Sequence, residues 1–385
     1  MNYIGEFVDE VRSRRSHFQS ILGLTKDRSR LEETLREGIL EHWSNLPDRA
    51  FCFGREFAVD SSSAMRSLSN GIELFITRSM MIGNDESKMK GVKFEMIKAP
   101  PAAMISLNFE RMLRDLIEVE AVLNNSDSLK EGDIVLVDGN LYGRLTHLVE
   151  ELPLENWRHL PLLIFERLQN LFTKCREKKV MLVGVSKFSR TRVLCSALLN
   201  EKGINLTDPL FLDTEIINRF RQGVPGLSSP LLLGEYALER AEEMRIDPES
   251  YRKRFFRNIP ESQVEWAVKT IRGVSEAPAI AMFHMTPAPG EQPLRVDIPA
   301  SCLGIDAKIM DVRPYKFIDP SIVEPVVKQL LSGYGGREVY NALLWATDHE
   351  VRLGDQAVDT IYRQVIGDEL GIQVEYDRSS RRFHG

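Results

Sequence analysis

Apolar runs that end in a single carboxylate occur at two places in the chain. The first run extends from Phe51 to Val59 and ends at Asp60, and three serines follow it. The second extends from Ile134 to Val137 and ends at Asp138, before a glycine. Short apolar runs bounded by turn residues are typical of buried strands. The pattern therefore predicts two strands that each present one acid where the strand ends.

The rest of the hydrophobic pattern predicts a mixed α/β fold. Residues 71–82 and 92–97 are expected to pair with the first strand in an antiparallel sheet. Farther along, strands and helices alternate, which implies parallel strands joined by crossovers. The remaining predicted strands are 133–138, 180–186, 277–285 and 294–298. The predicted helices are 6–22, 27–43, 105–124, 160–178, 191–200, 321–331, 338–351 and 356–370.

The same pattern predicts how the chain is divided. Proline and glycine residues interrupt the periodicity between residues 201 and 275, so we expect that segment to be irregular. We expect a helical segment over residues 1–48, a main α/β domain over 49–355 that contains the irregular insertion, and a C-terminal helix and tail over 356–385.

Composition restricts the class of protein. The 385 residues are 43% hydrophobic and 28% charged, which is typical of a soluble globular protein. No apolar run approaches the length of a membrane span, and the first residues lack a signal peptide, so we expect a cytoplasmic protein without a membrane partner. The four cysteines lack zinc-ligand spacing. A net charge of −6 excludes a generally basic surface for nucleic acid but is compatible with a metal-dependent nuclease.

Acidic residues supply the candidate chemistry. Asp60 and Asp138, on neighbouring strands, could share Mg²⁺ or Mn²⁺, because hard cations prefer carboxylate oxygen. The helix at 105–124 carries Glu118, which could join them, and Glu120 is an alternative. Either aspartate could instead only start a turn or cap a helix.

Two further residues could support phosphodiester hydrolysis. Lys187 follows the strand at 180–186 and could bind the scissile phosphate. His349 lies in the predicted helix 338–351 and could move protons or complete a metal shell, or it could be an ordinary core histidine. The chain has no GxxxxGK[ST] motif, so ATP is not bound by a P-loop.

Basic residues give candidate DNA contacts. Arg190 follows Lys187 closely, and Arg252 and Arg254 lie in a basic and aromatic cluster, residues 251–257. Such a cluster can track a nucleic-acid backbone and stack on bases, or it can be a solvated helix face with core aromatic residues.

The order of several motifs resembles the NurA nuclease family over about residues 50–355. They are Ala58-Val59-Asp60-Ser61-Ser62, Ile117-Glu118-Val119-Glu120-Ala121, Leu136-Val137-Asp138-Gly139-Asn140-Leu141, Gly184-Val185-Ser186-Lys187-Phe188-Ser189-Arg190, Leu294-Arg295-Val296-Asp297-Ile298-Pro299 and a late segment with Tyr340, Ala346, His349 and Glu350. The resemblance departs from the family at Ser61, where glycine is usual, and at Asn341, where proline is common.

The resemblance implies a fold and an activity. It implies an RNase H-like mixed sheet with helical additions at both ends, and a Mn²⁺-dependent (or Mg²⁺-dependent) deoxyribonuclease that is both a 5′–3′ exonuclease and a single-strand endonuclease. It also implies a homodimer that works with a HerA-type hexameric ATPase in DNA end resection or defence. The implied metal ligands are Asp60, Glu118, Asp138 and His349, and the implied supporting catalytic residues are Lys187, Tyr340 and His349.

Two other functions fit the same residues. One is another RNase H-like nuclease that acts on RNA. The other is a catalytically silent scaffold that only docks on a DNA motor. A cleavage assay with DNA and RNA separates these alternatives.

Overall fold

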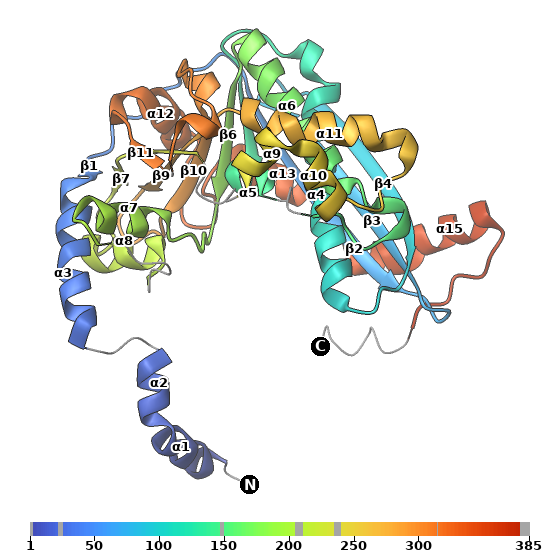
Figure 1. The fold of residues 1–385 in the computed structure, drawn as a ribbon, viewed down its shortest axis with the longest axis horizontal. Coiled ribbons are helices and arrows are strands. Elements are labelled where there is room, and N and C mark those ends of the chain that lie inside the picture. Colours follow the sequence, from blue (N-terminus) through green and yellow to red (C-terminus); the bar gives the residue numbers. More distant parts are fainter. Residues whose placement is uncertain are drawn as a thin grey trace. The chain divides into compact units, whose positions relative to one another are not determined.

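The computed structural model describes residues 3–21, 26–146, 150–204, 211–234, 240–313 and 315–377 (Figure 1). The chain forms two compact units. The smaller unit comprises Met1–Leu46, Phe188–Ser229 and His284–Leu294, and the larger unit comprises Pro47–Lys187, Pro230–Phe283 and Arg295–Gly385. All of the predicted metal ligands belong to the larger unit.

The smaller unit is mainly helical. Its elements are α1 (Ile4–Ser13), α2 (Arg15–Ile21), α3 (Lys26–Glu41), α7 (Val193–Glu201) and α8 (Asp213–Arg221), with the short paired strands β1 (Trp43–Ser44) and β7 (Gly226–Ser228). Helix α3 packs against α7 and α8 through its buried Leu35 and Ile39. The single helix predicted over 6–22 is divided at Arg14, whose backbone leaves the helical conformation with φ −107° and ψ 15°.

The larger unit is organised around a mixed sheet. Strands β2 (Glu56–Ser67), β3 (Ile72–Gly83) and β4 (Lys88–Lys98) form an antiparallel meander. Strand β5 (Ile134–Asp138) pairs with β2 in parallel, and β6 (Met181–Ser186) pairs with β5 in parallel. Strand β10 (Leu294–Pro299) then pairs antiparallel with β6, so the order is β10-β6-β5-β2-β3-β4. The strands β8 (Leu231–Leu233), β9 (Ile280–Thr286) and β11 (Tyr315–Phe317) extend the sheet. The predicted mixed sheet is confirmed.

Helices flank the sheet, as predicted. Helix α4 (Ala103–Asn124) packs on β2 and β3 and against α6 (Leu160–Lys178), and a cluster around Phe109, Leu113 and Leu116 forms the core there. The later helices are α12 (Glu324–Ser332), α13 (Ala342–Val351), α14 (Asp355–Ala357) and α15 (Arg363–Leu370). Within the described part of the chain, every helix is too short or too polar to cross a membrane.

The hydrogen bonds of the serines after Asp60 show which helix covers each face of β2. Side chains alternate between the two faces of a strand. The hydroxyls of Ser61 and Ser63 donate to Glu118 and Glu110 of α4, whereas the hydroxyl of Ser62 accepts a hydrogen bond from the Leu353 backbone, just after α13. Helices α4 and α13 therefore cover opposite faces of β2.

The prediction that the first strand ends at Asp60 is wrong. Strand β2 begins at Glu56 and continues to Ser67, and β3 pairs with it from Phe57 to Ser67. The serines stay in the strand because β3 satisfies their backbone groups and the neighbouring elements satisfy their hydroxyls. The run before Glu56 is not part of the strand, and Phe51 is largely exposed.

The segment 201–275 is more regular than the sequence indicates. Besides α8 and the short strands, it contains α9 (Ala241–Ile246), α10 (Pro248–Phe255) and α11 (Val264–Arg272). Proline here starts a helix instead of breaking one: Pro248 opens α10, and the Asp247 side chain caps it by accepting from the Ser250 backbone N–H. In the described parts of this segment, three helices therefore belong to the larger unit.

Candidate active site

Two acids meet where β2 extends past β5. The parallel pairing of these strands runs from Glu56 with Ile134 to Val59 with Val137. The next residues are Asp60 on β2 and Asp138, the last residue of β5. Because the strands are parallel and in register, the two carboxylates lie in neighbouring positions at the sheet edge where β5 ends. Asp138 thus ends its strand, as predicted, whereas Asp60 lies within its strand.

Asp60 lies in a strongly unfavourable environment for a negative charge. The residue is 3% exposed. Burial, together with the charges of Glu118 and Asp138, raises the pKa of Asp60 to about 7. The Ser61 backbone N–H donates to Asp60 Oδ1 at 2.7 Å, and Arg114 Nη2 lies 3.9 Å from that oxygen, but these contacts offset only part of the effect. A cation beside Asp60 would relieve this repulsion.

Glu118 is held by protein groups of its own. Its carboxylate accepts from the Ser61 hydroxyl and forms an ion pair with Arg144, and both Glu118 and Arg144 are buried. Burial raises the pKa of Glu118, and Arg144 opposes that rise. Arg144 also contacts Asp115 Oδ1 at 3.3 Å and the Asp138 carbonyl oxygen at 3.1 Å.

The carboxylates near the end of β5 offer few oxygen ligands for a divalent cation. Across the described residues, no three His, Cys, Asp or Glu side chains form a ready-made metal cluster. Asp60 and Asp138 lie close enough for the charge of Asp138 to raise the pKa of Asp60, and carboxylate oxygen suits Mn²⁺ and Mg²⁺. The donor set therefore fits one such ion between the two aspartates, with Glu118 turned toward Arg144.

Lys187 and Tyr340 complete the site. Lys187 Nζ lies 3.7 Å from Asp138 Oδ2 and 4.0 Å from the centroid of the Tyr340 ring, a cation–π contact. The Tyr340 hydroxyl is buried and lies near the Asp138 side chain. Burial and the charges of Asp138 and Asp60 raise the pKa of Tyr340, so its phenol stays protonated and can donate.

Tyr340 is positioned by its neighbour. The helix predicted over 338–351 begins only at Ala342, because the Asn341 side chain caps it by accepting from Leu344 N at 2.9 Å. The Asn341 amide also donates to the buried Glu56 at 3.3 Å, and Glu56 accepts a second hydrogen bond from Gln329. This Glu56–Gln329–Asn341 cluster joins the start of β2 to the residue next to Tyr340.

With this geometry established, comparison with known proteins identifies the family. The model of the NurA domain matches residues 55–352. The chain belongs to the NurA family. Among solved structures, it is similar to the NurA nuclease from Sulfolobus solfataricus, with 16% identity over 96% of this chain and 98% of that chain and a TM-score of 0.59. A NurA bound to dAMP and manganese is 13% identical over 92% of this chain and 97% of that chain, with a TM-score of 0.55. Curated protein sequences gave no significant match.

Of the two glutamates in the NurA motif of α4, only Glu118 is directed at β2. Glu120 lies 3.5 Å from Lys93 and 4.0 Å from Arg167, and no ion pair or hydrogen bond links it to the aspartates in the described part of the chain. Helical geometry turns positions two residues apart in different directions. Glu118 therefore lies beside β2 and Glu120 does not, and Glu118 as the metal ligand stays a prediction.

His349 is outside the core. Its side chain is 48% exposed, its Nδ1 lies 2.9 Å from the Trp345 carbonyl oxygen, and its ring packs on the Trp345 ring. The core-histidine interpretation is therefore wrong. Among the described contacts, none joins His349 to Asp60, Glu118 or Asp138. The neighbouring Asp348 nevertheless contributes to the raised pKa of Tyr340, so α13 passes near the site.

The three arginines predicted to contact DNA lie in different surroundings. Arg254 forms an ion pair with Glu243 and stacks on Phe255. Arg252 is half-buried on the same helix, and its aromatic neighbours Tyr251 and Phe256 are fully buried, so these two rings cannot stack on bases. Arg190 is exposed and belongs to the smaller unit.

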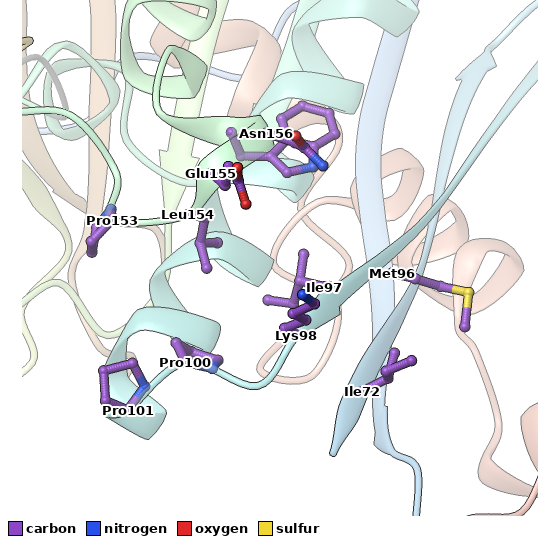
Figure 2. Close-up of a pocket in the computed structure, with 11 residues that line it drawn as sticks. Ile72, Met96, Ile97, Lys98, Pro100, Pro101, Pro153, Leu154, Glu155 and Asn156 are labelled. Atoms are coloured by element: carbon purple, nitrogen blue, oxygen red, sulfur yellow. The ribbon is translucent and has the colours of Figure 1, made fainter. Parts of the chain in front are cut away.

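A cavity of about 400 Å³ lies elsewhere in the larger unit (Figure 2). Pro100 and Pro101 before α4, the end of β4 and residues 153–157 line it. None of the candidate catalytic residues contributes to its wall. The site of the acids is therefore distinct from this cavity.

Proposed function

We propose that this member of the NurA family is a deoxyribonuclease that depends on Mn²⁺ or Mg²⁺. The observation that carries the proposal is the meeting of Asp60 and Asp138 at the end of β5, with Lys187 and the buried Tyr340 hydroxyl beside them. The manganese and dAMP bound by one similar NurA support the same class of chemistry.

Each residue has a proposed role. Asp60 and Asp138 hold the ion. Glu118 is a further acid next to them, and Arg144 and Ser61 orient its carboxylate. When bound, the ion neutralises charge on the phosphate and acidifies a water molecule. Lys187 binds a phosphate oxygen, and the protonated Tyr340 hydroxyl donates a hydrogen bond to the same group. We assign the substrate as DNA and the activities as 5′–3′ exonuclease and single-strand endonuclease, in keeping with the family.

A cleavage assay tests this proposal. DNA and RNA of the same sequence, single- and double-stranded and labelled at either end, are incubated with the protein in Mn²⁺, Mg²⁺, Zn²⁺ or EDTA. We expect DNA cleavage in Mn²⁺ and Mg²⁺ only, because oxygen donors without cysteine select hard cations. Cleavage of RNA alone would indicate the other RNase H-like activity, and no cleavage under any condition would indicate a silent scaffold.

Lys187 gives a prediction with a matched control. Lys187→Ala removes the cation beside Asp138, and we expect the cleavage rate to fall by roughly 10²-fold, the usual cost of losing one preorganised phosphate contact. Lys179, at the opposite end of β6, is exposed and forms an ion pair with Glu131, on the surface of the described structure. Lys179→Ala should therefore cleave at the wild-type rate. Equal rates for the two variants would remove Lys187 from the mechanism.

His349 stays a predicted catalytic residue. Because its side chain is half-exposed, His349→Ala should melt within about 1 °C of the wild type, whereas its rate should fall by roughly 10²-fold if the imidazole serves the reaction. Differential scanning calorimetry and single-turnover cleavage measure the two effects. A wild-type rate would show that His349 takes no part.

We also propose a homodimer that docks on a HerA-type hexameric ATPase, since the sequence has no P-loop of its own. The exposed Phe7 and Val8 of α1 support the N-terminal helices as the docking surface. Light scattering should give twice the chain mass, and Phe7→Glu should abolish co-elution with the ATPase while cleavage persists. A monomer would contradict the proposed homodimer. Co-elution that Phe7→Glu leaves unchanged would contradict the proposed docking surface.

A further inference from the structure

Arg144 occupies a position between oxygens that a cation could otherwise bind. Its Nη2 contacts the Glu118 carboxylate and lies 3.1 Å from the Asp138 carbonyl oxygen, and its Nε lies 3.3 Å from Asp115 Oδ1. Three oxygens from α4 and β5 thus converge on one guanidinium. Oxygen donors of these types are the ones that divalent cations use.

Two features of the backbone place the Arg144 side chain beside Asp138. Asn140 caps the short helix α5 (Leu141–Leu145), which carries Arg144 back toward Asp138. Gly139 has a φ of +107°, a conformation that disfavours other residues, and a Cβ added there would be in ordinary contact with Arg144 Nη2. Arg144 is 6% exposed, so its charge is held in place by its carboxylate partners and cannot move out into solvent.

We propose that Arg144 is a positioning residue that acts as a permanent cation beside the two aspartates, holds Glu118 away from the metal and limits the site to one divalent ion. This inference rests on the proposed metal-dependent nuclease and specifies its metal stoichiometry. Nucleases that use two ions place the second one between carboxylates. Here the guanidinium pairs with the Glu118 and Asp115 oxygens that a second ion would need.

Manganese binding measured without substrate tests this inference. The free Mn²⁺ signal in electron paramagnetic resonance gives the number of ions bound and their Kd. We expect one Mn²⁺ per chain for the wild type. In Arg144→Gln, Glu118 loses its ion pair with Arg144, and we expect binding to tighten by about tenfold or a second ion to bind. Arg144→Lys keeps the charge and should still bind one ion.

A double-mutant cycle tests the link to Glu118. Glu118→Gln should weaken Mn²⁺ binding by about 10- to 100-fold in the wild-type background, as is usual for a group outside the ligand set. In the Arg144→Gln background the same change should cost more, because Glu118 is then free to bind the ion. An equal or smaller cost in that background would overturn the inference.

The matched control is Arg55, which forms a two-point contact with the buried Asp133 at the opposite end of β2 and β5. Arg55→Gln should lower stability and leave Mn²⁺ binding unchanged. Two ions in the wild type would overturn the inference and leave the nuclease proposal standing. A wild type that binds no Mn²⁺ would overturn both. If Arg144→Gln does not fold, the number of ions that the wild type binds and the Mn²⁺ affinity of Glu118→Gln still test the inference.

Discussion

Asp60→Asn is expected to reduce cleavage by roughly 10³-fold or more and, at the same time, to stabilise the metal-free protein at pH 8. The loss of activity follows because one of the two carboxylates between which the ion binds has gone. The gain in stability follows because burial, together with the charges of Glu118 and Asp138, disfavours the ionised Asp60 and raises its pKa to about 7.

The sign of the stability effect depends on pH. A carboxyl group whose pKa is raised by folding favours the folded state when protonated, and this contribution is lost as the pH rises through about 7. At pH 8 the asparagine variant avoids that loss, which we expect to be worth about 2–4 kcal/mol at 1.36 kcal/mol per pKa unit. At pH 4 the wild-type carboxyl is also neutral, so the difference should be small.

Thermal unfolding in EDTA at the two pH values measures this effect. Asp133→Asn serves as the control, since Asp133 is buried in an ion pair with Arg55 and its replacement should destabilise the protein. An Asp60→Asn variant that melts below the wild type at pH 8, or that cleaves at a normal rate, would contradict the assignment of Asp60.

Manganese affinity is expected to fall by about 10²-fold between pH 7 and pH 5. Below its pKa of about 7, Asp60 binds a proton that the cation must displace, which costs about tenfold in affinity per pH unit. Titrations followed by electron paramagnetic resonance at pH 5, 6, 7 and 8 measure the slope. In Glu118→Gln the midpoint should move to lower pH, because one of the carboxylates that raise the Asp60 pKa is removed. A flat profile in the wild type would show that Asp60 does not compete with protons for the metal.

The sequence predicted the parts of the fold that depend on local pattern. The helix at 160–178 was predicted to the residue, and the strand ending at Asp138 was predicted because its apolar run is bounded by a glycine turn. The extension of β2 past Asp60 could not be predicted in this way. It depends on pairing with β3, which supplies backbone partners to three serines that would otherwise favour a turn.

The sequence predicted the acids of the candidate site but not the arginine that pairs with one of them. Arg144 lies 26 positions from Glu118 and has no motif of its own, so only the packing of α4 beside the end of β5 brings the two together. The position of Tyr340 outside α13 follows from the cap formed by Asn341, the residue where the family resemblance expects proline. Proline has no side-chain oxygen to cap a helix, and this chain obtains the same stop from a hydrogen bond.

The Glu56–Gln329–Asn341 cluster constrains how this part of the protein can vary. Its three members come from the start of β2, from α12 and from the residue before α13, yet one carboxylate receives hydrogen bonds from both amides. A change at one position leaves a buried polar group unsatisfied at another. In a randomised library selected for cleavage, positions 56, 329 and 341 should therefore be recovered as a small number of compatible triplets, and proline at 341 should be accepted only when residue 56 is no longer an acid.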